Sequence, residues 1–346
     1  MVRVRLLACA SAFALFAGGA VFACGDRTGL LAPQNESQGS STGGLTDAGV
    51  DVALAFDAGT ESALPPIEVT HAPDAASNAN SCPDAAATLV YVITEQSDLM
   101  SFYPPTGTFT RIGHLQCPAS RIPDANGTKP ATPFSMAVDR RGIAYVVYNS
   151  GELFRVSTAT AACRPTGFVA GQQGFTNGFG MGYSQDPQGS GETLYVASDG
   201  LDDPAAGAPR LGTIDTQSFR LQVLGPFGSA LYGAELTGTG AGDLFAFYTP
   251  APDGGSISAM AIGQVDKTTR QLARNSDLPG IDRGCGWAFA FWGGDFYTFT
   301  APGDCGGPPP GTVVNRFSPQ DGLTVRVAQI SEEIVGAGVS TCAPQQ

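Results

Sequence analysis

Cysteine is the residue type with the most varied chemistry in this chain. Two of the eight cysteines, Cys9 and Cys24, lie in or at the end of an apolar N-terminal stretch. The other six are not spaced as close Cys-x-x-Cys pairs and have no nearby histidine cluster, so disulfides are favoured over a zinc site. These six are Cys82, Cys117, Cys163, Cys285, Cys305 and Cys342.

Residues suited to catalysis or metal binding are sparse. The chain has two histidines, His71 and His114, too few for a histidine metal cluster, and a histidine-based triad is improbable. Carboxylate and amide oxygens are the ligands that calcium prefers. Glu235, Asp139 and Asn177 are the candidate oxygen ligands, because the repeat pattern described below places them near a central channel. The aromatic residues Trp287 and Tyr232 are candidate ligand contacts at the same channel. A solvated role for the acids, and a core role for each aromatic, are the simpler interpretations.

The N-terminus carries an export signal. Arg3 and Arg5 precede an uncharged apolar stretch from Leu6 to Ala23. The ending Val21-Phe22-Ala23-Cys24 resembles the bacterial lipobox, which implies cleavage before Cys24 and acylation of that residue. The alternative is an ordinary signal cleaved after Ala23. No Asp directly follows Cys24, which by resemblance to lipoprotein sorting implies the outer membrane.

The chain is predicted to have three regions: a signal peptide over 1–23, a tether over 24–81 and a folded domain over 82–346. The tether is rich in Gly, Ser, Ala, Asp and Pro, is acidic, and lacks sustained apolar periodicity. Such a composition cannot bury enough apolar surface to become ordered, so we expect a disordered linker to the membrane.

The region after residue 82 contains an internal repeat with a period near 50 residues. Each copy has a central apolar strand and a second strand that ends before a turn, followed by a third strand. The central strands are Leu89–Val92, Ala144–Val147, Leu194–Val196, Leu244–Phe247 and Phe296–Phe299. The second strands end at Phe102, Val156, Ile214, Val265 and Phe317.

A stretch of small residues precedes every central strand except the first, as at Gly180–Tyr183 and Gly286–Phe289. The missing one is supplied at the other end of the chain by Ile334–Val339. Four strands per repeat and one strand exchanged between the ends predict an all-β fold, a five-bladed β-propeller closed by its own termini. Two β-sandwich domains are the rival fold, but they would not explain one period throughout.

The motifs Phe102-x-Pro-x-Thr-Gly107 and Asp139-x-x-Gly-x-x-Tyr145-Val146 resemble repeats of secreted propellers of the NHL, YVTN and quinoprotein-like kind. The resemblance spans 82–346 at the level of the repeat. None of the catalytic residues of those families transfers to this chain.

The repeat alignment also predicts the disulfide pairs. Cys342 ends the inner strand of blade one and Cys82 precedes the next strand of the same blade, so their bond would lock the ring. Cys285 enters blade five, and Cys305 lies in a loop of that blade on the same face. Cys117 and Cys163 are left for each other.

The net charge of −13 opposes binding to nucleic acid and to anionic headgroups. The preferred function is a cell-envelope lipoprotein whose propeller is a non-catalytic binding or scaffold module for a protein, peptide or glycan. The alternative is a propeller enzyme, a metal-assisted hydrolase, lactonase or lyase, with its site at the central channel. No cofactor is expected beyond the calcium that the channel acids would accept.

Overall fold

The computed structural model describes residues 64–69, 89–188, 191–198, 208–228, 231–250, 260–303, 305 and 311–346. The chain divides into two units, Met1–Thr60 and Glu61–Gln346, and the first lies wholly outside the described residues. The predictions for the signal, Cys24, the tether apart from residues 64–69, and Cys82 therefore fall outside the described part. Among the described residues, no helix combines the length and apolar character needed to cross a membrane.

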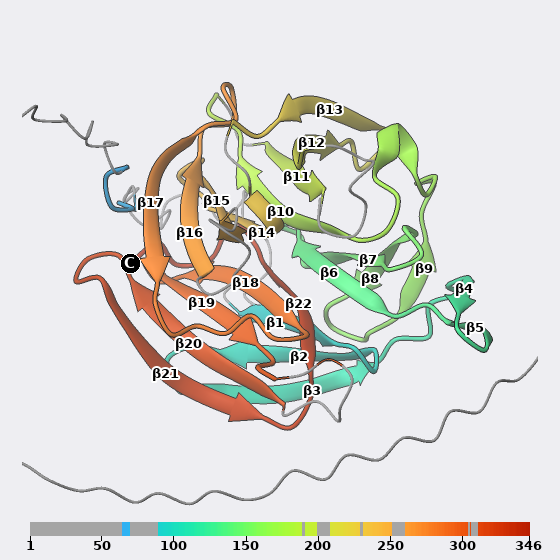
Figure 1. Ribbon diagram of the computed structural model, residues 1–346. Coiled ribbons are helices and arrows are strands. Elements are labelled where there is room, and N and C mark those ends of the chain that lie inside the picture. Colours follow the sequence, from blue (N-terminus) through green and yellow to red (C-terminus); the bar gives the residue numbers. More distant parts are fainter. Residues whose placement is uncertain are drawn as a thin grey trace, which may run out of the picture. The chain divides into compact units, whose positions relative to one another are not determined.

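The second unit is a five-bladed β-propeller, as predicted (Figure 1). Each blade is a four-stranded antiparallel sheet whose strands follow one another from the axis outward. Blade one contains, from the inner to the outer strand, β22 (Ile334–Val339), β1 (Val90–Thr94), β2 (Asp98–Tyr103) and β3 (Thr108–His114). Blade two contains β6 (Pro133–Val138), β7 (Ile143–Tyr148), β8 (Leu153–Ser157) and β9 (Cys163–Pro165).

The remaining blades repeat this order. Blade three contains β10 (Phe179–Gln185), β11 (Glu192–Ser198), β12 (Arg210–Ile214) and β13 (Leu221–Pro226). Blade four contains β14 (Leu231–Gly238), β15 (Leu244–Pro250), β16 (Met260–Val265) and β17 (Leu272–Leu278). Blade five contains β18 (Trp287–Trp292), β19 (Asp295–Thr300), β20 (Thr312–Ser318) and β21 (Leu323–Ile330).

The ring closes through the strand exchange that the sequence predicts. Strand β22, from the C-terminal end of the chain, pairs antiparallel with β1, with Val339 opposite Val90 and Ala337 opposite Val92. The inner strands contact one another in turn around the ring: β22, β6, β10, β14 and β18. Small residues are needed at these contacts, because a Cβ on Gly180 would meet the carbonyl oxygen of Ala234 on the neighbouring blade.

The core lies between the blades. Side chains of a strand alternate between its two faces, so each blade contributes to two interfaces. Val90 and Val92 pack in a cluster with blade five, whereas Tyr91 and Ile93, on the opposite face of β1, pack in a cluster with blade two. The same arrangement continues around the ring, with apolar clusters between blades two and three, three and four, and four and five.

A small hairpin that the repeat pattern does not predict follows blade one. It consists of β4 (Arg121–Asp124) and β5 (Gly127–Pro130), which pair antiparallel and are mostly exposed. Ala125 and Asn126 form the two-residue turn between them, and Gly127, which begins β5, has a φ of 127° that favours glycine. The flanking residues lack apolar alternation, and the pattern of apolar residues therefore predicts no strand at this place.

Residues Leu64–Val69, which we term the strap, pack against blade four. Ile67 is 1% exposed and belongs to the apolar cluster between blades four and five. The backbone N–H of Asn275 donates to the carbonyl of Pro65 at 2.9 Å, and the guanidinium of Arg274 lies 2.8 Å from the carboxylate of Glu68. In Figure 1 the strap is the short blue segment beside β17. The folded part of the chain thus includes residues upstream of the boundary expected at Cys82.

Candidate functional site

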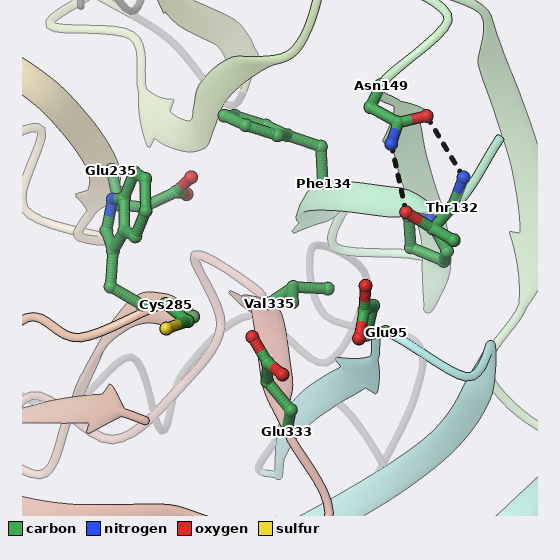
Figure 2. Close-up of a pocket in the computed structure, with 11 residues that line it drawn as sticks. Glu95, Thr132, Phe134, Asn149, Glu235, Cys285, Glu333 and Val335 are labelled. Carbon is green, nitrogen blue, oxygen red and sulfur yellow. Dashed lines mark hydrogen bonds between the residues drawn. The ribbon is translucent and has the colours of Figure 1, made fainter. Parts of the chain in front are cut away.

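A cavity of about 180 Å³ lies at the end of the ring where β6, β18 and β22 begin. Its lining combines three carboxylates, from Glu95, Glu235 and Glu333, with the aromatic rings of Phe134 and Trp287. Figure 2 shows Glu235 on one side of this cavity and the pair Glu95 and Glu333 on another, below Phe134. We call it the acidic pocket.

Glu333 is the most unusual group in the acidic pocket. It directly precedes β22 and is 7% exposed, yet among the described residues none donates a hydrogen bond to its carboxylate. The backbone N–H of Glu95 donates to the Glu333 carbonyl at 2.9 Å, which holds the two glutamates side by side. Burial, and then the like charge of Glu95, raise the pKa of the Glu333 carboxyl. A positive ligand would relieve both effects.

Room for the Glu333 side chain is provided by Gly286. A Cβ at Gly286 would lie 2.9 Å from Cγ and 3.0 Å from Oε1 of Glu333. Any larger residue would push the carboxylate out of its place. Gly286 belongs to the stretch of small residues that the repeat pattern places at the inner strand of blade five. It therefore makes room for a pocket side chain in addition to its place in the ring.

Glu235 lies on the opposite wall and is almost fully buried, at 2% exposed. The hydroxyl of Ser135 on β6 donates to its Oε2 at 2.7 Å. The pairing of β14 with β15 shifts register between Tyr232 and Glu235, and such a bulge re-aims the side chains beside it. Glu235 is thereby held in one orientation at the pocket.

The aromatic wall is rigidly held. The indole N–H of Trp287 donates to the carbonyl of Gly233 at 2.9 Å, and its ring forms a T-shaped pair with Phe134 at 6.2 Å between centroids. The guanidinium carbon of Arg283 lies 4.3 Å from the centroid of the indole ring, so a cation already covers one face of Trp287.

The structure brings together only some of the candidates named from the sequence. Glu235 and Trp287 line the acidic pocket, whereas Asn177 is exposed and neither it nor the half-buried Tyr232 is among the lining residues. Asp139 lies beyond the other end of β6. Its carboxylate accepts hydrogen bonds from the backbone N–H groups of Arg141 and Ile143, both at 2.9 Å, and closes the turn between β6 and β7.

Sequence reasoning missed Glu95, Glu333 and Phe134. Glu95 directly follows the central strand of blade one, and Glu333 directly precedes its inner strand. These two strands are antiparallel neighbours, so the end of one and the start of the other meet at one edge of the blade. The predicted strand exchange therefore contained a signal for this pair of acids.

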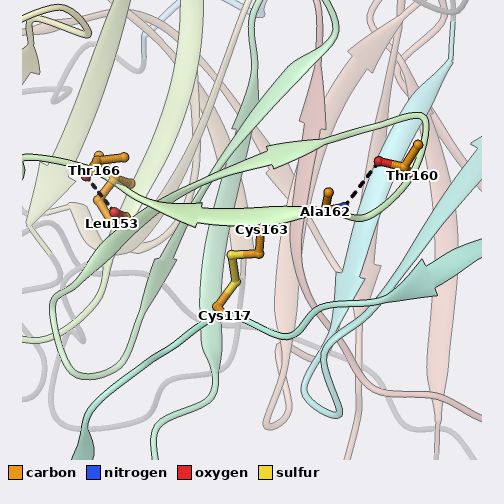
Figure 3. Close-up of a disulfide and its surroundings, with 6 residues drawn as sticks. All are labelled: Cys117, Leu153, Thr160, Ala162, Cys163 and Thr166. Atoms are coloured by element: carbon orange, nitrogen blue, oxygen red, sulfur yellow. Dashed lines mark hydrogen bonds between the residues drawn. A yellow bond between two sulfur atoms is a disulfide. The ribbon is translucent and has the colours of Figure 1, made fainter.

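Two of the predicted disulfides are present. Cys117 and Cys163, with Cα atoms 5.2 Å apart, join the loop after β3 to β9 and so link blades one and two (Figure 3). Cys285 and Cys305, with Cα atoms 5.1 Å apart, brace the entry to β18, and Cys285 itself lines the acidic pocket. Cys342 is disulfide-bonded, and the partner predicted for it, Cys82, lies outside the described residues.

A second polar cluster lies where the chain continues beyond β6 and β22. The carboxylate of Glu192 accepts a hydrogen bond from the backbone N–H of Arg140 at 2.8 Å and from the hydroxyl of Thr341 at 2.7 Å. Burial raises the pKa of Glu192, against the effect of these bonds. Thr341 belongs to the segment after β22, so the chain's own C-terminal residues occupy this cluster.

The chemistry that the acidic pocket offers is attraction of positive charge. Its carboxylates are partly or fully withdrawn from water, where electrostatic interactions are stronger than at an open surface. Within the described ranges, no group of three or more His, Cys, Asp or Glu side chains is arranged to hold a metal ion.

Comparisons with known proteins find a weakly similar solved structure and no relative by sequence. No protein-family model matches the chain, and no curated protein matches it. Among solved structures, the crystal structure of the tricorn protease is similar at 12% sequence identity and a TM-score of 0.33, covering 70% of this chain and 25% of that chain. The matched part spans about a quarter of the length of that chain.

Proposed function

We propose that this protein is an exported, lipid-anchored binding module whose propeller recognises a positively charged ligand in the acidic pocket. The observation that carries the proposal is Glu333, a residue only 7% exposed whose side chain lines the cavity beside Glu95 and receives no hydrogen bond from the described residues. A buried charge without a partner costs free energy, and a bound cation would remove that cost.

The net charge of −13 supports the same ligand class, since a negative field raises the rate at which cations reach the pocket. The two disulfides agree with an oxidising, extracytoplasmic compartment. The lipobox-like ending at Cys24 supports a membrane anchor in the cell envelope. The lack of Asp directly after Cys24 supports sorting to the outer membrane.

The binding function is tested by titrating the mature protein at low salt with small cations and with anions of matched size. We expect the cations to bind and to raise the melting temperature, with binding that weakens as ionic strength rises. Equal binding of the anions, or no binding of any cation, would contradict the proposal. A calcium-dependent hydrolytic activity would instead support the enzyme alternative.

The anchor is tested by metabolic labelling with a fatty acid. The unmutated chain should incorporate the label and partition with membranes, and Cys24→Ser should do neither. If the unmutated chain remains unlabelled, the lipid anchor is wrong.

A further inference from the structure

We propose that the group bound in the acidic pocket is a primary alkylammonium, the end of a lysine side chain or of a free aliphatic amine. This inference rests on the proposed function and narrows its ligand class. Three observations carry it: the arrangement of the carboxylates, the apolar surface between them, and the size of the cavity.

The carboxylates approach the cavity from different elements. Glu95 and Glu333 belong to blade one, at the end of β1 and the start of β22, while Glu235 reaches in from β14 of blade four. An ammonium group is a compact charge with three N–H donors that point in different directions. A guanidinium is planar and suits a single carboxylate through two parallel bonds, so it matches this arrangement less well.

The wall between the carboxylates is apolar. Phe134, Val335 and the indole of Trp287 line the cavity. Calcium takes about 6 to 8 oxygen ligands, and this surface would leave much of its coordination shell unfilled. A methylene chain behind an ammonium group packs well against such a surface.

The aromatic rings do not form the kind of cage that a quaternary ammonium prefers. Such ligands bind over the open faces of several rings. One face of Trp287 is already covered by Arg283 at 4.3 Å, and Phe134 meets Trp287 in a T-shaped pair. A trimethylated group also has no N–H to donate to Glu333.

The cavity has the volume for a short chain. At about 180 Å³ it holds roughly six groups of the size of a water molecule, each taking about 30 Å³ in the liquid. Butylammonium has one nitrogen and a chain of methylene and methyl groups, and its non-hydrogen atoms are fewer than the groups that the cavity holds. It also has the four carbons and the ammonium group of a complete lysine side chain.

The experiment is calorimetric titration of the mature full-length protein at constant ionic strength. The probes are butylammonium, butylguanidinium, tetramethylammonium and calcium chlorides. We expect butylammonium to bind at least about tenfold more tightly than each of the others, a difference of about 1.4 kcal/mol. Glu333→Gln should weaken it by about tenfold or more. The matched control is Glu332→Gln, because Glu332 is the exposed neighbour whose carboxylate bonds to Ser331, and this variant should bind as the unmutated protein does.

The outcomes separate this inference from the proposed function. If calcium or butylguanidinium binds more tightly than butylammonium, and Glu333→Gln weakens that binding, the ligand class is wrong but the cation site stands. If no probe binds, or Glu333→Gln binds all probes unchanged, both proposals fail. Glu333→Gln keeps the shape of the side chain, and a melting curve checks that it folds.

A second arm compares butylammonium with N-acetyl-lysine methylamide. Tighter binding of the lysine derivative supports the alkylammonium assignment and identifies a polypeptide as its source. Tighter binding of butylammonium also supports the assignment and identifies free amines. Failure of both compounds to bind overturns it.

Discussion

The replacement of Ile67 by alanine tests whether the strap is part of the folded domain. Ile67 is 1% exposed among apolar residues of blades four and five, so alanine removes methyl and methylene groups from a packed interface. Large-to-small changes of this kind cost about 2 to 5 kcal/mol. The strap is a short segment that can detach from the interface as a whole. The loss of stability in Ile67→Ala therefore cannot exceed the free energy with which the strap binds to the blades. We therefore expect a loss of about 2 to 3 kcal/mol, near the lower end of that range.

For a domain of this size, such a loss lowers the melting temperature by about 3 to 5 °C. Scanning calorimetry of the mature protein measures it. Leu64→Ala is the matched control, because Leu64 belongs to the same strap but is 42% exposed, and it should melt within about 1 °C of the unmutated protein. Limited proteolysis gives a second measurement, since a released strap is a better substrate for cleavage.

Two results would refute this reasoning. If Ile67→Ala melts with the unmutated protein and is cleaved no faster, the strap contributes nothing to the domain. If Leu64→Ala destabilises as much as Ile67→Ala, the effect does not come from burial of the isoleucine between blades four and five.

Three further outcomes are expected. Burial raises the pKa of the Glu333 carboxyl, so the folded state binds the proton of this carboxyl more tightly than the unfolded state does. The free energy of unfolding therefore falls as pH rises from about 4.3 through the raised pKa. Glu333→Gln should melt at a higher temperature than the unmutated protein at pH 7 and at the same temperature at pH 4. Cys117→Ser with Cys163→Ser, which opens a link across 46 residues, should cost at most about 4 kcal/mol, and an unchanged melting curve would contradict a stabilising bond. Truncation before Ile334 removes β22 and exposes the edge of β1, so the product should aggregate in light scattering, and a monomeric, folded product would contradict strand exchange.

The internal repeat is the feature of the sequence that predicted the fold. Each central strand alternates apolar side chains that fill two interfaces, and the small residues before it mark the strand nearest the axis, where Gly180 meets the backbone of the next blade. Because these constraints recur five times, an error in one copy does not disturb the register. The β4–β5 hairpin and the strap occur once, so no periodic pattern predicts them.

The sequence by itself determined the five-bladed ring and its closure by Ile334–Val339, since both follow from the order of strands along the chain. The repeat alignment, with elimination for Cys117 and Cys163, also gave the two cysteine pairs that the structure describes. Only the tertiary structure decided which acids share a site. Glu95, Glu235 and Glu333 are far apart in the chain and belong to two non-adjacent blades, and they meet because all the blades converge on one axis. Likewise, Ile67 lies in a segment whose composition predicts disorder, and it is buried because the junction of blades four and five offers a surface that its own neighbours in sequence do not.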